Sequence, residues 1–417
     1  MVSNMGNGTF VKSAFKPKTK TSGRPLRLPF DVPLLLIVAI LLVFGLLMVY
    51  SSSWDASILM DKEPTYIFGR QVLWVILGII GAIILSLIDY HRYEKFLVFI
   101  MIACISLLVI VLIINDIRFN SSRALLGGSI QPAELSKVVI ILYLSFWLYK
   151  RQDNLKDINI GLLPLGVILG LISGLIFIQP DISASATILM LGIMLFFLAG
   201  GDWKQIVLVT AVILLAGGGI VAATPTGSIR ISDYLSGLKT PIEGSYHIQR
   251  TFEAIIKGGI FGVGIGQADT KFTGLPLPHT DSIFAVVAEE TGLIGAIIII
   301  ILFCLLLWRG FVIAKRAPDQ LGSLLAYGLT GWIALEALMN AAVIVGLFPF
   351  TGNALPFISA GGSSMMSSLA AIGIVMNIAR CSVKQETSER SQTSAVVDLR
   401  RRDRRRRVPR GNRRASP

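Results

Sequence analysis

Long apolar stretches constrain this sequence more than any other feature. Ten stretches contain few charged side chains and have about the length of a transmembrane helix. About 20 apolar residues are needed to cross the hydrocarbon core of a bilayer. Because lipid offers the backbone no hydrogen-bond partners, such stretches fold as helices. The sequence therefore predicts an all-α polytopic membrane protein with about ten transmembrane helices. The candidate spans are residues 32–52, 70–89, 95–114, 134–149, 161–178, 182–200, 204–223, 283–310, 323–347 and 359–380.

The net charge of +13 comes mainly from the two ends of the chain, which argues against a nucleic-acid-binding surface. The loops alternate between basic and charge-poor, and cytoplasmic loops carry the excess of Lys and Arg. With an even number of spans and basic flanks at both ends, both termini are predicted to be cytoplasmic. The longest polar segment, about residues 224–282, then becomes a large extracytoplasmic loop between spans 7 and 8. The basic loops contain His91, Arg92 and Lys95; Lys150, Arg151 and Lys156; Lys204; and Lys315 and Arg316.

This pattern divides the chain into three parts. Residues 1–30 form a basic cytoplasmic tail, and residues 31–380 form the transmembrane domain. The first span follows a long polar segment without a small-residue cleavage site, which favours an uncleaved anchor. Residues 381–417 form an Arg-rich cytoplasmic tail that is predicted to be disordered. Two interpretations of this tail are open: attraction to the anionic inner leaflet and contact with a cytoplasmic partner.

One carboxylate, Asp281, stands where the long polar loop meets the eighth span. It follows the sequence LPLPHT, in which two prolines stiffen the backbone. A structural interpretation is available, because Asp281 or Thr280 could cap the free N–H groups of the apolar helix. The helix face that begins at Asp281 continues with small residues, which suits close helix packing. The acid therefore opens onto a protein interface, and it is the candidate for catalysis.

A second candidate site opens the fourth span, where Pro132 begins the helix and Glu134 falls in its first turn. Both residue types are common at helix starts. Capping does not explain Lys137, which lies three residues further into the membrane. Glu134 and Lys137 are spaced to meet on one helix face. Such a pair in a membrane is either functional or a structural clasp, and both interpretations stay open.

The long loop contains an amphipathic helix, predicted over residues 246–257 and ended by Gly258 and Gly259. It either packs on the bundle or lines a site where a lipid headgroup rests. The glycine-rich segment 262–266 is either a tight re-entry or a cradle of backbone N–H groups for a pyrophosphate. The uncharged segment 348–364 is too irregular for a membrane helix and is predicted to form the wall of a substrate groove. The apolar face of the amphipathic helix contains Ile248, Phe252, Ile255 and Ile256.

A series of short motifs runs through residues 32–380. They are Arg123, Gln131-Pro132-x-Glu134-x-x-Lys137, Gln179-Pro180-Asp181, Gln249, Gly258-Gly259-x-Phe261-Gly262-x-Gly264, Leu275-Pro276-x-x-His279-Thr280-Asp281, Glu289-Glu290-x-Gly292, Asn340 and Leu355-Pro356-Phe357-Ile358-Ser359-x-Gly361-Gly362-Ser363-Ser364. In this order they resemble the SEDS family (shape, elongation, division and sporulation). A single such motif is weak, whereas the whole ordered series is highly specific.

The resemblance implies a peptidoglycan glycosyltransferase that polymerises lipid II, an undecaprenyl-diphosphate-linked disaccharide-peptide, on the outer face of the cytoplasmic membrane. Asp281 aligns with the essential aspartate of the family and is predicted to be the general base. The departing diphosphate needs cations, for which Arg123, Lys137 and Arg250 are candidates. A divalent cation, Mg or Mn, could assist, although the sequence offers no ligand set that proves one. The predicted substrate-binding residues are Arg123, Gln131, Glu134, Lys137, Gln249, Arg250, His279, Ser359 and Ser363.

The resemblance also implies a class B penicillin-binding protein as transpeptidase partner, together with divisome proteins. The long basic tails favour the division branch of the family, with septal wall synthesis in the cytoplasmic (inner) membrane. An elongation-type polymerase is the alternative within the family. A lipid II flippase predicts ionisable residues across the whole bilayer, whereas this chain concentrates its polar features on the external half. A scaffold that only recruits division proteins predicts tolerance of changes at Asp281.

Overall fold

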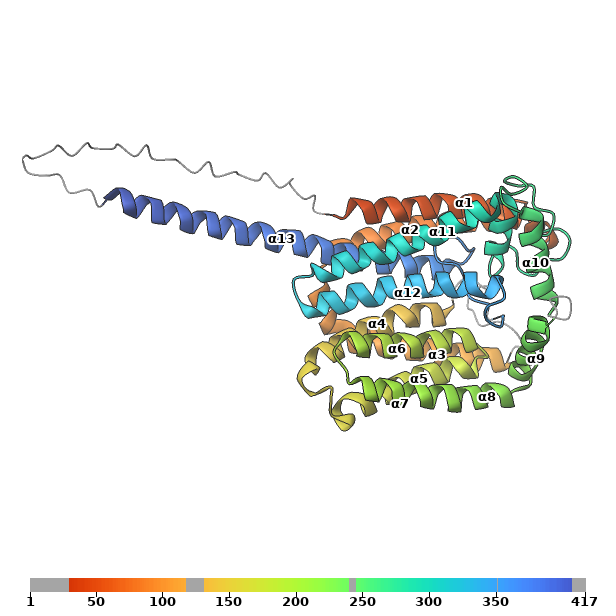
Figure 1. Ribbon diagram of the computed structural model, residues 1–417, viewed down its shortest axis with the longest axis horizontal. Coiled ribbons are helices and arrows are strands. Elements are labelled where there is room, and N and C mark those ends of the chain that lie inside the picture. Colours follow the sequence, from red (N-terminus) through yellow and green to blue (C-terminus); the bar gives the residue numbers. More distant parts are fainter. Residues whose placement is uncertain (1–29, 118–130, 240–244, 351, 407–417) are drawn as a thin grey trace, which may run out of the picture.

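The computed structural model describes residues 30–117, 131–239, 245–350 and 352–406, which form helices joined by loops, without a strand. The helices run side by side in one bundle (Figure 1), which confirms the predicted all-α class. They are α1 (Val32–Leu59), α2 (Tyr66–Leu87), α3 (Leu97–Ile117), α4 (Pro132–Lys150), α5 (Leu163–Ile178), α6 (Ile182–Leu198), α7 (Trp203–Val212), α8 (Gly218–Ala223), α9 (Pro225–Lys239), α10 (Tyr246–Gly258), α11 (Ile283–Lys315), α12 (Gln320–Ile344) and α13 (Gly362–Arg406). Short helices of other types lie at Tyr90–Phe96, Gln152–Asn154, Ile158–Leu162 and Ile213–Gly217.

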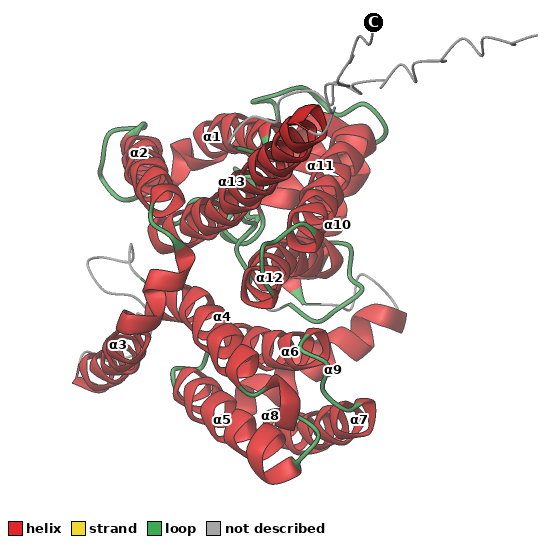
Figure 2. Cartoon of the chain, turned by 90° about the vertical axis from the view of Figure 1, so that its left-hand side faces the viewer, coloured by secondary structure: helices red, strands yellow, loops and turns green. Residues whose placement is uncertain are grey.

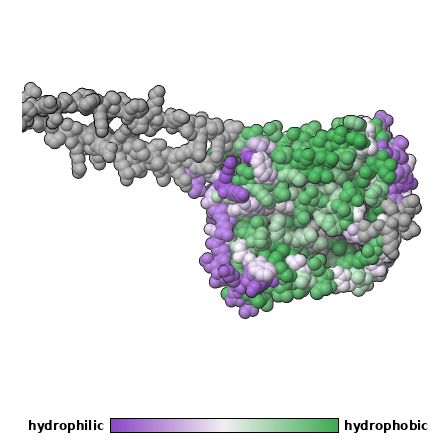
Figure 3. Space-filling view, viewed as in Figure 1, coloured by the Kyte–Doolittle hydropathy of each residue, from purple (hydrophilic) through white to green (hydrophobic). Residues whose placement is uncertain are grey.

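The surface of the bundle is that of a protein surrounded by lipid. Among the described residues, eight helices are long and apolar enough to cross a membrane. Figure 3 shows apolar side chains in a broad belt between two polar margins, so the chain is a multi-pass membrane protein. Two further apolar helices, Ile182–Leu198 and Trp203–Leu215, are shorter. The count of ten spans therefore stays a prediction.

The helices form two groups on either side of α4 (Figures 1 and 2). One group contains α1, α2, α11, α12 and α13, and the other contains α3, α5, α6, α7 and α8. Within the first group α13 packs along α2, and α11 packs along α12 and α1. Small residues allow the closest approach: a side chain at Gly373 of α13 would meet the carbonyl oxygen of Ala82 in α2 at 2.5 Å. Such contacts favour helix association in lipid, where the hydrophobic effect offers little.

One end of the bundle, here called the α10 end, carries α9, α10 and the loop 259–282 (Figure 1). The predicted amphipathic helix is confirmed as α10. Its buried face, however, contains Thr251 and Ala254, while Ile256 is 76% exposed instead of lying on that face. The helix is rolled in this way because Gly258 lies directly against the backbone of Ala288 in α11, where a larger residue does not fit.

The C-terminal segment differs from its prediction. The sequence predicts a disordered tail from residue 381, whereas α13 continues as a helix to Arg406 and runs out of the bundle (Figure 1). Residues 383–406 contain neither Pro nor Gly, and seven of these 24 residues are Arg. Arginine opposes burial, but it also has high helix propensity. The N-terminal tail up to residue 29 and residues 407–417 lie outside the described residues.

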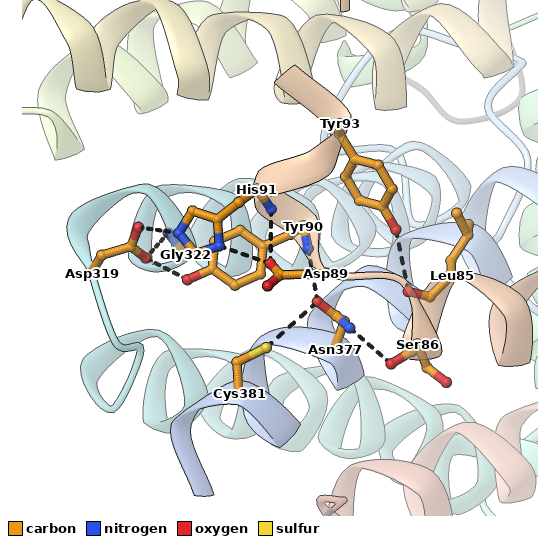
Figure 4. A network of polar contacts seen from close by, with 10 residues as sticks. All are labelled: Leu85, Ser86, Asp89, Tyr90, His91, Tyr93, Asp319, Gly322, Asn377 and Cys381. Carbon is orange, nitrogen blue, oxygen red and sulfur yellow. Dashed lines mark hydrogen bonds and ion pairs between the residues drawn. The ribbon is translucent and has the colours of Figure 1, made fainter. Parts of the chain in front are cut away.

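A polar network holds the end of the bundle opposite α10 (Figure 4). The hydroxyl of the buried Tyr90 donates to Asp319 Oδ1 at 2.5 Å. The ring of His91 lies between Asp89, at 2.8 Å, and Asp319, at 3.0 Å. Asn377 of α13 accepts from the Tyr90 backbone N–H and donates to a carbonyl at the end of α2. The network therefore joins α2, α12 and α13 at this end of the bundle.

Candidate active site

Asp281 lies at the α10 end, immediately before α11, and is half-buried. The N-cap position of α11 belongs to Ser282, one residue beyond the two that the sequence favours. The N–H groups of Thr280 and Ser282 both donate to the Leu277 carbonyl, each at 3.2 Å. Leu277 has a φ of 49°, a left-handed conformation that is costly for a leucine. Such a conformation persists only where the surrounding structure holds the backbone in it. The acid is therefore presented by a stiff turn.

Asn340 and Gly352 border Asp281. Asn340, near the end of α12, donates from Nδ2 to the carbonyl oxygens of Asp281 at 3.0 Å and Asn353 at 2.5 Å. A Cβ atom on Gly352 would lie 3.1 Å from Asp281 Oδ2, and Gly352 has a φ of 68°. The backbone of Asp281 is thus fixed by a side chain of α12, and its carboxylate faces a position that has no side chain.

Ser359 fixes the residues before Asp281. Its hydroxyl donates to the Thr280 carbonyl at 2.7 Å and accepts from the Leu355 N–H at 2.7 Å. The Ala360 N–H donates to the His279 carbonyl at 2.9 Å. The uncharged segment after α12 therefore lies against the candidate acid, where the sequence predicts a groove wall. Because the Ser359 hydroxyl is buried and satisfied within the protein, its contacts position the turn.

Two histidines lie in and behind this turn. His247 of α10 contacts Ser282 Oγ through Nε2 at 2.7 Å, and its ring lies 3.7 Å from that of Phe350. Since Ser282 Oγ donates to the Pro276 carbonyl, His247 Nε2 is the donor to Ser282. Burial lowers the pKa of His247 to about 4 and also lowers the pKa of His279. Both imidazoles are therefore neutral near pH 7.

A buried ion cluster joins α4 to α12. Lys137 Nζ lies 2.7 Å from Glu134 Oε1 and also pairs with Glu336 of α12. The contact predicted between Glu134 and Lys137 is thus confirmed. Glu336 is absent from the residues that the sequence singled out, although an acid inside an apolar stretch is itself a signal. Lys137, a predicted cation for the diphosphate, has its charge balanced here by two carboxylates.

The ion cluster and the turn at Asp281 share one helix face. Glu336 and Asn340 are four residues apart on α12, so they lie one above the other. Both are buried. Asn340 holds the backbone of Asp281, and Glu336 holds Lys137 of α4. The position of α4 in the bundle is in this way connected to the position of the candidate acid.

Two further predicted residues meet where α4 and α13 begin. The Gln131 N–H donates to Ser363 Oγ at 3.1 Å, and Gln131 Nε2 donates to Asp181 Oδ2 at 2.9 Å. Asp181 also caps α6 by accepting from the Ala184 N–H at 3.1 Å. These contacts gather the starts of α4, α6 and α13 at the α10 end.

The remaining predicted residues lie on α10 or outside the described residues. Arg250 pairs with Glu253 at 2.6 Å, and its Nε donates to the Tyr246 hydroxyl at 3.1 Å. Gln249, beside it, is exposed. Arg123 falls outside the described residues. The substrate-binding roles of these three residues stay predictions.

Glu289 and Glu290 of α11 hold the loop after α10. Glu290 pairs with Lys271 at 2.8 Å, and both side chains are buried. The N–H groups of Val263 and Gly264 donate to the Glu289 and Glu290 carbonyls, each at 3.0 Å. Of the two interpretations of the glycine-rich segment, the tight re-entry is therefore supported. These two N–H groups are used within the protein and cannot also bind a pyrophosphate.

Among the residues that the structure describes, no three His, Cys, Asp or Glu side chains lie close enough together to hold a metal ion. The need for Mg or Mn stays a prediction.

The arrangement can support acid–base chemistry on a bound alcohol. A half-buried carboxylate is held in a stiff turn at the margin of the membrane, beside neutral imidazoles. A positioned carboxylate can accept a proton from a hydroxyl group as that group attacks an electrophile.

The family profile FtsW/RodA/SpoVE, described as cell cycle proteins, matches residues 32–384. Stage V sporulation protein E of Bacillus subtilis (strain 168) is 36% identical over 358 residues, covering 84% of this chain and 97% of that protein. A protein named probable peptidoglycan glycosyltransferase FtsW, from Trichlorobacter lovleyi, is 36% identical over 369 residues, covering 85% of this chain and 94% of that protein.

Two solved structures share the fold. One belongs to a study of the structural coordination of polymerization and crosslinking by a peptidoglycan synthase complex, with a TM-score of 0.70 and 26% identity over 85% of this chain and 99% of that chain. The other is the rod shape determining protein RodA of Thermus thermophilus, with a TM-score of 0.61 and 25% identity over 85% of this chain and 98% of that chain.

Proposed function

Since this chain belongs to the FtsW/RodA/SpoVE family, we propose that it is a peptidoglycan glycosyltransferase that polymerises lipid II. Several relatives named probable peptidoglycan glycosyltransferase FtsW match 84% or 85% of the chain. The observation that carries the proposal is Asp281, which the stiff turn and Asn340 hold at the membrane margin. Its substrate is a disaccharide-peptide linked through a diphosphate to an undecaprenyl chain.

Asp281 acts in this proposal as general base. It takes the proton from a sugar hydroxyl of one substrate, whose oxygen then forms a bond to the anomeric carbon of the other. The bond between that carbon and the diphosphate oxygen breaks, and the polyprenyl diphosphate leaves with the electron pair. Because this leaving group is already activated, one base suffices and the carboxylate pair of glycoside hydrolysis is not required. A carboxylate is a weak base toward an alcohol, so accurate positioning supplies much of the rate.

The proposal places the α10 end outside the cell and both termini in the cytoplasm. Lys and Arg gather in the loops at the opposite end, as expected on the cytoplasmic side. A class B penicillin-binding protein is the proposed transpeptidase partner, supported by the likeness to a structure from a complex that couples polymerisation with crosslinking. Other proteins of the division machinery are also proposed partners.

A role in division and a septal location are part of the proposal. The relatives named FtsW and the sporulation protein support it, whereas the likeness to RodA keeps the elongation-type polymerase as the alternative. A fluorescently tagged copy distinguishes the two. Recruitment to midcell supports the division role, and distribution along the lateral wall supports elongation.

Polymerisation by the purified protein tests the activity directly. The full chain, with its proposed partner, is incubated with lipid II, and the products are separated by length. Glycan strands are expected, and EDTA added to a parallel reaction tests the need for a divalent cation. A chain that folds, binds its partner and leaves lipid II unchanged would exclude the proposed activity.

Gly352→Ala is expected to slow polymerisation between about 10- and 100-fold, because a displacement of reacting groups by about 1 Å has effects of this size. The added methyl group would press on Asp281 Oδ2, and the φ of 68° disfavours any residue with a side chain. Initial rates on lipid II measure the effect. Gly200→Ala is the matched control, because Gly200 has a φ of 90° but open space around it. Equal rates in the two variants would show that the space beside Asp281 does not matter.

Truncation after Ser382 is expected to leave polymerisation in vitro unchanged. The Ser382 hydroxyl donates to the Arg316 carbonyl at 2.5 Å, and beyond this contact α13 runs out of the bundle (Figure 1). The truncated and full-length proteins are compared on lipid II in the same detergent. Lost activity in a truncated chain of normal thermal stability would show that the tail takes part in the reaction.

A further inference from the structure

A cavity of about 230 Å³ lies against the two residues that precede Asp281. Its wall is made by the first turns of α2, by His279 and Thr280 of the turn, and by Gly361 and Gly362 at the start of α13. None of the described residues that line it is an acid. Lys137 and Arg250, two of the cations that the sequence singled out for the diphosphate, do not line this cavity.

Arg70 supplies the positive charge of this cavity. It lies in the first turns of α2, half-buried. Its guanidinium stands 5.6 Å from the Tyr66 ring and 3.5 Å from the Tyr66 hydroxyl. Among the described residues it makes no ion pair with a carboxylate, unlike Lys137, Arg250 and Lys271. A guanidinium with this freedom can offer two parallel N–H groups to a phosphate.

Other groups of the wall favour an anion as well. Gln71 accepts from the Gly361 N–H at 3.1 Å and donates to the Ser359 carbonyl at 3.2 Å, which fixes the start of α13 at the cavity. The first N–H groups of a helix carry partial positive charge and attract anions. The Arg70 guanidinium and the first N–H groups of α13 thus lie at one space.

The size and location of the cavity restrict the anion. Its volume is below the range of about 300–1,000 Å³ that encloses a drug-sized molecule, so it suits a compact headgroup. Its α2 wall continues into the membrane belt, where Leu73 and Ile76 are half-exposed or more. A hydrocarbon chain attached to the headgroup can therefore remain in lipid beside α2. These features fit an anion that is linked to a membrane chain.

We propose that this cavity binds the diphosphate of a polyprenyl-linked sugar and that Arg70 is its phosphate-binding side chain. This inference rests on the proposed function, which requires such a substrate beside Asp281. A diphosphate in the cavity lies next to His279 and Thr280, and the sugar attached to it is then adjacent to the turn that carries the base. Arg70 would also balance the charge that develops on the diphosphate as it leaves.

Binding of undecaprenyl diphosphate to the full-length protein in detergent tests the inference. Arg70→Gln is expected to weaken binding about 10- to 100-fold, the usual loss for a hydrogen-bonded charge pair. Arg70→Lys keeps the charge without the paired N–H geometry. Its affinity should therefore lie between those of Arg70→Gln and the wild type. Lys62→Gln is the matched control, because Lys62 is an exposed cation beside Tyr66 and does not line the cavity. Its affinity should equal that of the wild type.

Competition separates the possible sources of the diphosphate. A lipid-linked diphosphate should displace the labelled probe, whereas inorganic pyrophosphate and phosphatidylglycerol should not compete at similar concentrations. Equal displacement by either one overturns the inference, and so does unchanged affinity in the Arg70 variants. If Arg70→Gln does not fold, the affinity of Arg70→Lys decides by the same criterion. Arg70-dependent binding by a wild-type protein that makes no glycan refutes the proposed function and leaves this inference standing.

Discussion

Asp281→Asn is expected to abolish measurable glycan synthesis from lipid II, a loss of about 100- to 10,000-fold for the removal of a general base. Asparagine has nearly the shape of aspartate but cannot accept the proton of the attacking hydroxyl. The fold should survive, because the stiff turn depends on backbone groups of Leu277, Thr280 and Ser282 and on Asn340, which binds the Asp281 carbonyl and not its side chain. The rate is measured with purified protein and partner, and thermal unfolding checks the fold.

Asp269→Asn is the matched control for that experiment. Asp269 lies in the same loop and is exposed, and the contact that holds it to Glu289 comes from its backbone N–H. This variant should polymerise lipid II at the wild-type rate. Polymer made by folded Asp281→Asn protein at a similar rate would remove Asp281 from the role of base. Binding of lipid II should be similar in both variants, so the difference should appear in kcat.

Lys137→Met is expected to destabilise the protein by about 3–5 kcal/mol, the cost of leaving buried charge without a partner. Lys137, with a side chain 3% exposed, is the cation between Glu134 and Glu336, whose side chains are 11% and 3% exposed. Without it, two carboxylates face each other between α4 and α12. Low yield and a lower unfolding temperature in detergent are the expected observations.

The neutral triple variant Glu134→Gln, Lys137→Met and Glu336→Gln tests the reason for that loss. It removes the cation and both acids together, so no buried charge is left uncompensated, and it should recover most of the stability. Lys150→Met is a second control, because Lys150 pairs with Glu94 at the exposed surface, where such pairs contribute little. Lys137→Met protein as stable as the wild type would show that the cluster carries no such cost.

Apolar length and charge pattern were sufficient to predict the class of fold. A stretch such as 32–52 has no alternative to a helix in lipid, because its backbone must satisfy its own hydrogen bonds. The amphipathic period predicted α10, and the i, i+3 spacing predicted the contact of Glu134 with Lys137. These relations are local, so the residues within one helix determine them. The helix after Ser382 was not predicted, because composition alone does not distinguish a solvated helix from a disordered chain.

The composition of the site depended on contacts between distant segments. Glu336, Arg70 and Gln71 belong to helices whose sequences do not reveal which neighbour they meet. Glu336 acquires its role only when α12 packs beside α4, and Arg70 only when α2 packs beside the start of α13. Which face of α10 is buried was likewise decided by the contact of Gly258 with α11. The hydrophobic pattern within α10 gives no information about that contact.

The sequence by itself determined that the chain is a bundle of membrane helices in which Asp281 lies where the long polar loop meets a span. Only the tertiary structure decided what surrounds that acid: the Asn340 amide, the bare backbone of Gly352 and a cavity lined by Arg70. The physical reason is that helix formation depends on near neighbours in the chain, whereas a site is assembled by packing between helices. Helices that pack together need complementary shape and complementary charge. Which residues meet these needs is known only from the arrangement of the helices in space.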